Sequence, residues 1–581
     1  MRAPARVAGI ALAFATLIWL PAFLAPRATG FGDWQMIHHN LEAALAAIRA
    51  GDLPLWDPFH CGGVTSWGNP ESQHFAPWVL LAALALGSTL ATKVLLVAHT
   101  ALGAAGAFRY ARLRHGLGPA ASALVGGAWA ASGFFSWQMA GGHFTFAPYY
   151  LFPWLLLAWR RSLEELRAVP AVVVLLVAIV LEGGTYPFPH ALLALALDTL
   201  IALAGRPGQE PRAVTRPRSS TVAWNGAIAV GLVVLLTAVR WLPIAETLTR
   251  FPRTVTSTDA PAAMDLMKAW VLSESEWRAP GRLYVWPEYC AYLGWPVVGL
   301  AAVGTVRALR AHRTALVGLA IFFVLAMGAF HPWAPWSLLH RLPLYDSLRV
   351  PSRLQVLLTF YVALLAGIGL DAINRGATRA LGQRDWWEGT AWGIVVFALA
   401  PLVVFNLGNN DRWDGAPVES AGPAAPRFHL EATPDYHARY ALLPRQNKGT
   451  RSCYVGAMDW DVAPGLWNGD RPQARVADGE LRGVWRTPNH IHLDVSLPEP
   501  GRVLLDQNHD PDWQATTGTL TDERGLLALD LPGGDHSVTV SYRPWTLPWA
   551  AGSFVLGLVG LLALAWRTRR TAGPVLSGRL P

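Results

Sequence analysis

The residues best suited to chemistry lie in a polar stretch that follows the first apolar run of the chain. This stretch contains FGDWQMIHHN (31–40) and GDLPLWDPFHCGG (51–63). Asp33 stands close to the apolar run, where a carboxylate could take a proton from an acceptor hydroxyl. The alternative is that Asp33 caps a helix, because Asp is favoured at that position and residues 34–50 have helical periodicity. We favour the catalytic role, and the two roles are compatible.

A pair of arginines forms the second candidate. Arg349 and Arg353, in LPLYDSLRVPSR (342–353), are four residues apart and would share one face of a helix. A guanidinium fork suits a phosphate or pyrophosphate group, so we expect these side chains to bind phosphate. The alternative is that they bond to Asp346 or to loop carbonyls.

Several other polar residues could contact a substrate, and each also has a structural interpretation. Asp52 and Asp57 lie beside prolines, which favours turns. Glu182 ends an apolar span next to two glycines, where a substrate contact and a structural hydrogen bond are equally consistent with the sequence. The full set of these substrate-contact candidates is His38, Asp52, Asp57, His143 and Glu182.

Histidines could instead bind a divalent metal ion together with a carboxylate. The candidates are His38, His39, His60 and His143, but nothing like an HExxH motif is present. His38 and His39 are neighbours and would point to different faces of a helix. We therefore expect no metal ligands and no certain cofactor.

The composition shows what must position these residues. The chain has 581 residues, of which 52% are hydrophobic and 15% charged. Soluble domains carry about 25% charged residues, so this is an integral membrane protein. The net charge of +8 comes from arginines in short clusters between apolar spans. No basic face with aromatic platforms accompanies them, which argues against nucleic-acid binding.

The apolar runs and arginine clusters predict about 12 membrane spans with both termini in the cytoplasm. The segment from His74 to Leu90 is apolar but short, and counting it as a span would place Arg109, Arg112 and Arg114 on the outer side. We therefore expect it to be an interfacial or re-entrant helix. Residues 34–50 should form a helix on the membrane surface. The predicted spans are 7–26, 93–112, 117–137, 144–160, 168–184, 187–204, 221–243, 290–308, 313–330, 353–372, 390–407 and 546–567.

This topology divides the chain into a transmembrane domain (1–408) with outer loops 27–92 and 244–289, and an extracytoplasmic domain (409–545). A last helix and a basic cytoplasmic tail would follow (546–581). The period-two pattern and the Pro-Gly-Gly-Asp turn near residue 532 predict a small β-sandwich. The three cysteines, Cys61, Cys290 and Cys453, have no metal-ligand spacing, and although one disulfide is possible we expect them to be unpaired.

Several stretches together resemble the bacterial YfhO-like membrane proteins of the GT-C glycosyltransferase superfamily. They are GDLPLWDPFHCGG, AGGH (140–143), GTYPFPH (184–190), YLGWP (292–296) and LRVPSRLQVLLTFYVALLAGIGLD (348–371). The resemblance implies a GT-C membrane fold, a polyprenyl-phosphate-linked sugar donor, an extracytoplasmic acceptor and inversion at the anomeric carbon. By position it makes Asp33 the base and gives the donor phosphate to Arg349 and Arg353. Many GT-C enzymes pair two acidic residues at the span exit, and here only Asp33 stands there, so Asp52 or Asp57 would have to supply the second.

Two other functions compete with this one. A transporter or flippase for a lipid-linked glycan would need a polar path through the bundle, for which Lys93, His99 and Asp198 are the few candidates. A non-catalytic scaffold of cell-envelope assembly would need no reactive cluster. The presence of Asp33, Arg349 and Arg353 favours an enzyme.

Overall fold

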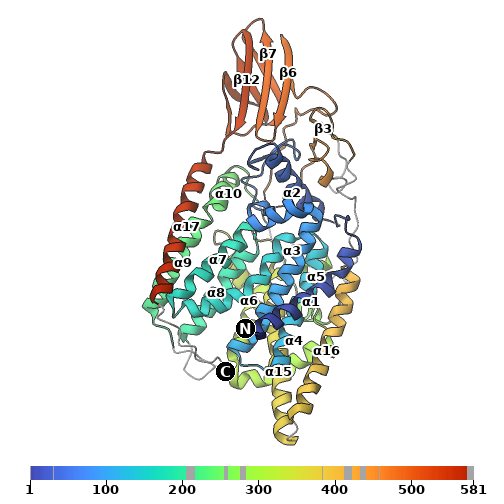
Figure 1. The fold of residues 1–581 in the computed structure, drawn as a ribbon, viewed down its shortest axis with the longest axis vertical. Coiled ribbons are helices and arrows are strands. Elements are labelled where there is room, and N and C mark those ends of the chain that lie inside the picture. Colours follow the sequence, from blue (N-terminus) through green and yellow to red (C-terminus); the bar gives the residue numbers. More distant parts are fainter. Residues whose placement is uncertain are drawn as a thin grey trace.

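The computed structural model shows a bundle of helices with a β-rich region at one end (Figure 1). It describes residues 2–571 except 31, 205–215, 254, 256–258, 275–282, 382–383, 411–421, 432–439 and 457. The basic tail predicted after residue 571 lies outside the described residues.

The bundle is built from apolar helices, and every predicted span coincides with at least one of them. Most are hydrophobic around their whole circumference, as expected for helices that face either lipid or other helices. The α-helices are α1 (Arg2–Leu24), α2 (Trp34–Arg49), α3 (Pro77–Arg114), α4 (Pro119–Ala130), α5 (Gly133–Ala140), α6 (Phe152–Ser162), α7 (Val169–Leu181), α8 (Pro187–Ala204), α9 (Ser219–Leu236), α10 (Ala238–Arg250), α11 (Ala263–Lys268), α12 (Trp295–Ala311), α13 (Arg313–Ala326), α14 (Pro335–Leu339), α15 (Gln355–Leu381), α16 (Arg384–Asn409) and α17 (Thr546–Thr571).

Among the described residues, seven helices are long and apolar enough to cross a membrane alone. They are α1, α3, α8, α9, α15 (extended to Pro351), α16 and α17. Helices α12 and α13 would form an eighth span as a pair, bent by 118° at His312. The remaining predicted spans fall on shorter pieces, α4 with α5, α6 and α7. The protein is therefore a multi-pass helical membrane protein with several interrupted helices.

The short apolar segment before the second span is a separate helical piece. Helix α3 breaks at Gly87, whose backbone adopts φ 77° and ψ 161°. A side chain at that φ would be strained, so the glycine permits the break between 77–86 and 88–114. The expected short helix is thus present, and its place at the membrane interface stays a prediction.

Helix α2 differs from its expected position. It is amphipathic as predicted, but almost all of its residues are buried, including His38, His39 and Glu42. One side packs against α3 and the other against the 3₁₀ helix η7 (Tyr440–Leu442). Glu42, fully buried, forms an ion pair with Arg445 (Nε–Oε2 2.8 Å). Helix α2 therefore lies between the bundle and a later polar segment, because that segment covers the face expected to be exposed.

The β-rich region contains two four-stranded antiparallel sheets, with strand orders β10-β11-β8-β5 and β6-β7-β12-β9. Alternate apolar side chains, such as Val503 and Leu505 of one sheet and Leu493 and Val538 of the other, form one shared core. The predicted C-terminal β-rich region is confirmed, and its extracytoplasmic location stays a prediction. Its strands are β5 (Ala474–Val476), β6 (Glu480–Thr487), β7 (His490–Leu497), β8 (Gly501–Asn508), β9 (Trp513–Ala515), β10 (Thr519–Glu523), β11 (Leu526–Leu531) and β12 (Gly534–Tyr542).

Two small strand pairs lie where hydrogen bonds join the first polar loop to this region. Strands β1 (Trp56–Asp57) and β2 (Val64–Thr65) form a hairpin inside the loop, and β3 (His429–Glu431) pairs in parallel with β4 (Lys448–Thr450). The backbone N–H of Gly62 donates to Thr450 (2.8 Å), and that of Asn508 donates to Gly62 (2.9 Å).

The expectation of unpaired cysteines is wrong for two of the three. Cys61 and Cys453 form a disulfide across 392 residues, and Cys290 is a buried free thiol. Local spacing could not indicate this pairing, because the partners meet only once the loop and the β-rich region have packed together.

Candidate active site

Asp33 faces a histidine. It occupies the residue before α2, but its side chain makes no capping hydrogen bond. Its Oδ2 instead lies 3.3 Å from Nε2 of His143. The geometry therefore does not favour Asp33 as a side-chain cap of α2. Both side chains are about one-fifth exposed, 19% for Asp33 and 24% for His143, so a substrate can reach them.

The AGGH stretch brings His143 to this position. The N–H of Asp33 donates to the carbonyl of Gly141 (3.1 Å), and Trp34 Nε1 donates to Met139 (2.7 Å). Gly142 adopts φ +91°, and a Cβ there would lie 2.2 Å from the nitrogen of Trp34. Only glycine allows the two backbones to approach so closely.

Gln138 fixes the orientation of the His143 ring. Its Nε2 donates to the carbonyl of Pro287 (3.0 Å) and faces Oε2 of Glu288 (3.4 Å). Both of these groups only accept hydrogen bonds when Glu288 is ionised, so the amide oxygen of Gln138 must face His143 Nδ1, which donates to it. The other ring nitrogen, Nε2, is then the one that faces Asp33.

Glu71 is a second carboxylate in this cluster, and the sequence reasoning missed it. Its Oε2 is buried and has no hydrogen-bond partner among the described residues. Burial raises the pKa of Glu71; the guanidinium of Arg253 opposes this rise, and the nearby Asp33 carboxylate adds to it. A Cβ on Gly456 would lie 2.9 Å from Glu71 Oε2, so the β-rich side of the protein also borders this carboxylate.

Arg353 forms a buried two-point ion pair. Its Nε and Nη2 donate to the two carboxylate oxygens of Glu288 at 2.8 and 2.6 Å. The rings of Tyr186 and Phe146 lie 4.3 and 4.9 Å from its guanidinium carbon. Burial raises the pKa of Glu288, but the charge and hydrogen bonds of Arg353 outweigh it and bring the pKa down to about 2.

Arg349 and Arg353 do not share a helix face. Arg349 precedes the 3₁₀ helix η5 (Pro351–Leu354), on which Arg353 lies. The N–H of Arg349 donates to the hydroxyl of Tyr186 (3.0 Å), and its carbonyl accepts from Tyr284 (3.2 Å). The expected shared face is wrong because Pro351 starts a new helical segment between the two arginines. Their role in phosphate binding stays a prediction.

The other predicted contact residues make structural bonds. Asp52 accepts from the Thr487 hydroxyl (2.6 Å) at the β6–β7 turn, and His38 Nε2 bonds the carbonyl of Thr29 (2.7 Å). Glu182 pairs with His99 (3.0 Å) and accepts from Trp78. Of the five, the structure brings only His143 into the cluster with Asp33. A substrate role for the other four gains no support from these contacts.

Asp57 belongs to a buried cluster with His39 and His60, whose ligand atoms all lie within 4.8 Å of one another. His39 bonds Asp57 (2.9 Å) through Nε2 and the carbonyl of Tyr440 (2.9 Å) through Nδ1. Burial lowers the pKa of His39, but Asp57 outweighs it and the net shift is upward. His60 Nε2 accepts the N–H of Tyr454 (3.2 Å). The cluster is therefore explained structurally: its ion pair joins α2 to strand β1 of the first loop, and the hydrogen bonds to Tyr440 and Tyr454 join it to the later segment.

Comparison with known proteins adds little to this geometry. No protein-family model matches the chain, and no curated protein matches it in sequence. Among solved structures it is similar to arabinofuranosyltransferase AftD from Mycobacteria, with a TM-score of 0.45 and 14% identity over 77% of this chain. A second structure of AftD gives 0.43 and 15% over 79%. The match covers 31% and 33% of the AftD chains, and TM-scores of this size do not establish a common fold.

Three members of the cluster carried only weak sequence signals. Gln138 lies two residues before the AGGH stretch, and Glu288 lies four residues before YLGWP. Glu71 follows Asn69 and Pro70 in a loop and carried no signal beyond its charge. Their roles depend on contacts between segments far apart in the chain.

Proposed function

We propose that the protein is a GT-C-type membrane glycosyltransferase. It moves a sugar from a polyprenyl-phosphate-linked donor to an extracytoplasmic glycan, lipid or protein acceptor. The observation that carries this proposal is the meeting of Asp33, Glu71 and His143 beside the ends of the membrane helices. One positioned carboxylate can take the proton of a hydroxyl, and a second carboxylate in different surroundings can hold that proton afterwards.

The reaction would be a single displacement. The acceptor oxygen forms a bond to the anomeric carbon as the bond from that carbon to the donor phosphate breaks. The acceptor proton passes to Asp33, and the lipid phosphate leaves with the bonding electron pair, so the anomeric configuration inverts. Glu71, whose pKa is raised by burial, provides a second site for the proton.

The leaving phosphate needs positive charge. Arg353 is committed to Glu288, so its proposed part is to hold Glu288 and, through it, Gln138 and the His143 ring. Arg349 and Arg253 lie beside this network. The positive charge of Arg349 opposes the rise in the pKa of Tyr284, and that of Arg253 opposes the rise in the pKa of Glu71. They are the proposed phosphate contacts.

The decisive experiment measures sugar transfer by the purified protein in liposomes. Radiolabelled polyprenyl-phosphate sugars are supplied as a panel, with extracted cell-envelope glycans as acceptors. Asp33→Asn should reduce transfer at least ~100-fold, the lower end of what general base catalysis contributes. Asp478→Asn, an exposed carboxylate of the β-rich region, is the matched control and should leave transfer unchanged.

Two results would contradict the proposal. Wild-type transfer in Asp33→Asn would remove Asp33 as the base. Movement of a lipid-linked glycan between leaflets, without transfer of any sugar in the panel, would support the flippase alternative instead.

A further inference from the structure

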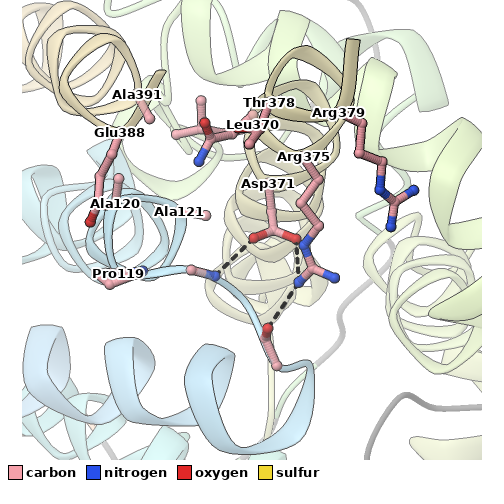
Figure 2. A pocket seen from close by; sticks show the side chains of 13 residues that line it. Pro119, Ala120, Ala121, Leu370, Asp371, Arg375, Thr378, Arg379, Glu388 and Ala391 are labelled. Atoms are coloured by element: carbon pink, nitrogen blue, oxygen red, sulfur yellow. Dashed lines mark hydrogen bonds and ion pairs between the residues drawn. The ribbon is translucent and has the colours of Figure 1, made fainter. Parts of the chain in front are cut away.

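A cavity of about 340 Å³ lies far from the candidate active site, at the end of the bundle opposite the β-rich region (Figures 1 and 2). Its walls come from the start of α4, the last turns of α15 and the first turns of α16. Its volume is near the lower limit for ligand pockets, which suits a small polar group.

One wall carries a paired charge. Asp371 accepts the N–H of Gly118 (2.8 Å) and forms an ion pair with Arg375 (2.6 Å). Arg375 also donates to the carbonyl of Gly116 (3.0 Å), yet its side chain remains 53% exposed. This guanidinium can therefore accept a further anionic partner from the open side.

The other wall carries an acceptor without a partner. Glu388 of α16 is exposed and forms no ion pair or hydrogen bond with the described residues. In Figure 2 it lies across the cavity from Arg375, while the side chain of Arg379 points away. Asn374 lines the cavity as well, and its Oδ1 has no partner among the described residues. A ligand with N–H donors on this side could pair with Glu388, and with Asn374 once its amide turns the buried Oδ1 toward the cavity.

The cavity lies where two membrane helices end. The span Pro351–Leu381 ends shortly after the lining residue Arg379, and the span Asp385–Asn409 begins shortly before the lining residue Glu388. Helix α16 exposes the apolar side chains of Val396 and Phe397, which are 69% and 68% exposed, as expected for a helix that faces lipid. Trp386 is 59% exposed near the end of the helix, where tryptophan commonly marks the headgroup level of a bilayer.

We propose that this cavity binds the headgroup of phosphatidylethanolamine from the adjacent leaflet. The charges match a zwitterion: the ammonium group faces Glu388 and the Asn374 amide, and the phosphate faces the exposed side of Arg375. An anionic headgroup would leave Glu388 without a counter-charge and meet repulsion from it. A trimethylated choline headgroup has no N–H to donate to the two acceptors.

The test is lipid retention by the full-length protein, measured by native mass spectrometry. The protein is reconstituted in nanodiscs that contain equal parts of phosphatidylethanolamine, phosphatidylcholine and phosphatidylglycerol. The wild type should retain phosphatidylethanolamine at least about threefold over the other two lipids. Glu388→Gln should abolish this preference. Asp385→Asn removes a carboxylate three residues away on the same helix, outside the cavity, and should preserve it.

Equal retention of the three lipids by the wild type would overturn the proposal. A preference for phosphatidylglycerol would show that the arginines dominate, which also contradicts it. Loss of the preference in Asp385→Asn as strongly as in Glu388→Gln would show a general charge effect. Displacement of the lipid by soluble phosphoethanolamine at low concentration would indicate a cytosolic ligand rather than a lipid.

Discussion

Replacement of Arg353 by methionine tests whether its ion pair organises the candidate active site. Arg353→Met keeps a long apolar side chain beside Tyr186 and Phe146 but leaves the carboxylate of Glu288 without its cation. The side chains of Arg353 and Glu288 are only 4% and 10% exposed, so water cannot replace the lost partner well. The variant should therefore be strongly destabilised.

The size of the effect follows from the pKa of Glu288. In the folded protein it is about 2, against an ordinary value of 4.5. This difference corresponds to about 3 kcal/mol of stability. Because the folded pKa is lowered, that stability is fully present above pH 4.5 and is lost as the pH falls toward 2. Breaking a buried pair typically costs ~3–5 kcal/mol, which agrees with this estimate.

The assay is the free energy of unfolding in a bilayer mimic, measured by steric trapping at pH 7. Arg353→Met should lose about 3 kcal/mol. The double variant Arg353→Met/Glu288→Gln removes the stranded charge and should recover at least half of this loss. Two results would refute the reasoning: a loss below ~0.5 kcal/mol in the single variant, or a double variant no more stable than the single one.

Two further predictions concern the β-rich region. Burial, with repulsion from Asp510 and Glu246, raises the pKa of Asp512 to about 7. The folded protein then holds a proton that the unfolded chain loses near its ordinary pKa of 3.8, so stability falls as the pH rises from about 4 to 7. Asp512→Asn should flatten the dependence of stability on pH and raise the free energy of unfolding at pH 8 by about 1–2 kcal/mol, after allowance for partial exposure. The measurement is thermal unfolding between pH 4 and 8, and an unchanged pH dependence would contradict the raised pKa of Asp512. Cys453→Ser removes the disulfide to Cys61 and should lower the free energy of unfolding by about 2–5 kcal/mol. Proteolysis near this position should also be faster than in the control Cys290→Ser, whose thiol is not in a disulfide. Equal proteolysis of the two variants would contradict this prediction.

The sequence was sufficient to predict those parts of the fold that depend on the local pattern of apolar and polar residues. The apolar runs predicted the membrane helices, and period-two alternation predicted the β-rich region. Gly87 shows the limit of the same reasoning. The short length of the apolar segment before Thr92 indicated a separate helix, but only the positive φ of Gly87 shows where that helix ends. Asp33 became a candidate because it closely follows a span, and its catalytic role stays a prediction.

Properties that depend on distant contacts could not be read in this way. Glu71, Gln138 and Glu288 belong to the cluster because segments 38 to 255 residues further along the chain pack against Asp33. The burial of α2 depends on residues near 440. In each case the local signal was a polar residue in a loop or on a helix, where polar residues are usually exposed, and the tertiary packing buried it or gave it a partner.

The disulfide between Cys61 and Cys453 has a consequence for how the chain is made. Its two halves are 392 residues apart. At ~5–20 residues per second, synthesis of the intervening chain takes about 20–80 seconds. During that time α2, with its buried Glu42 and His39, has no partner for either side chain from the later segment. Until the last quarter of the chain has been synthesised, the first polar loop therefore lacks its contacts with the later segment, and Cys61 cannot form its disulfide with Cys453.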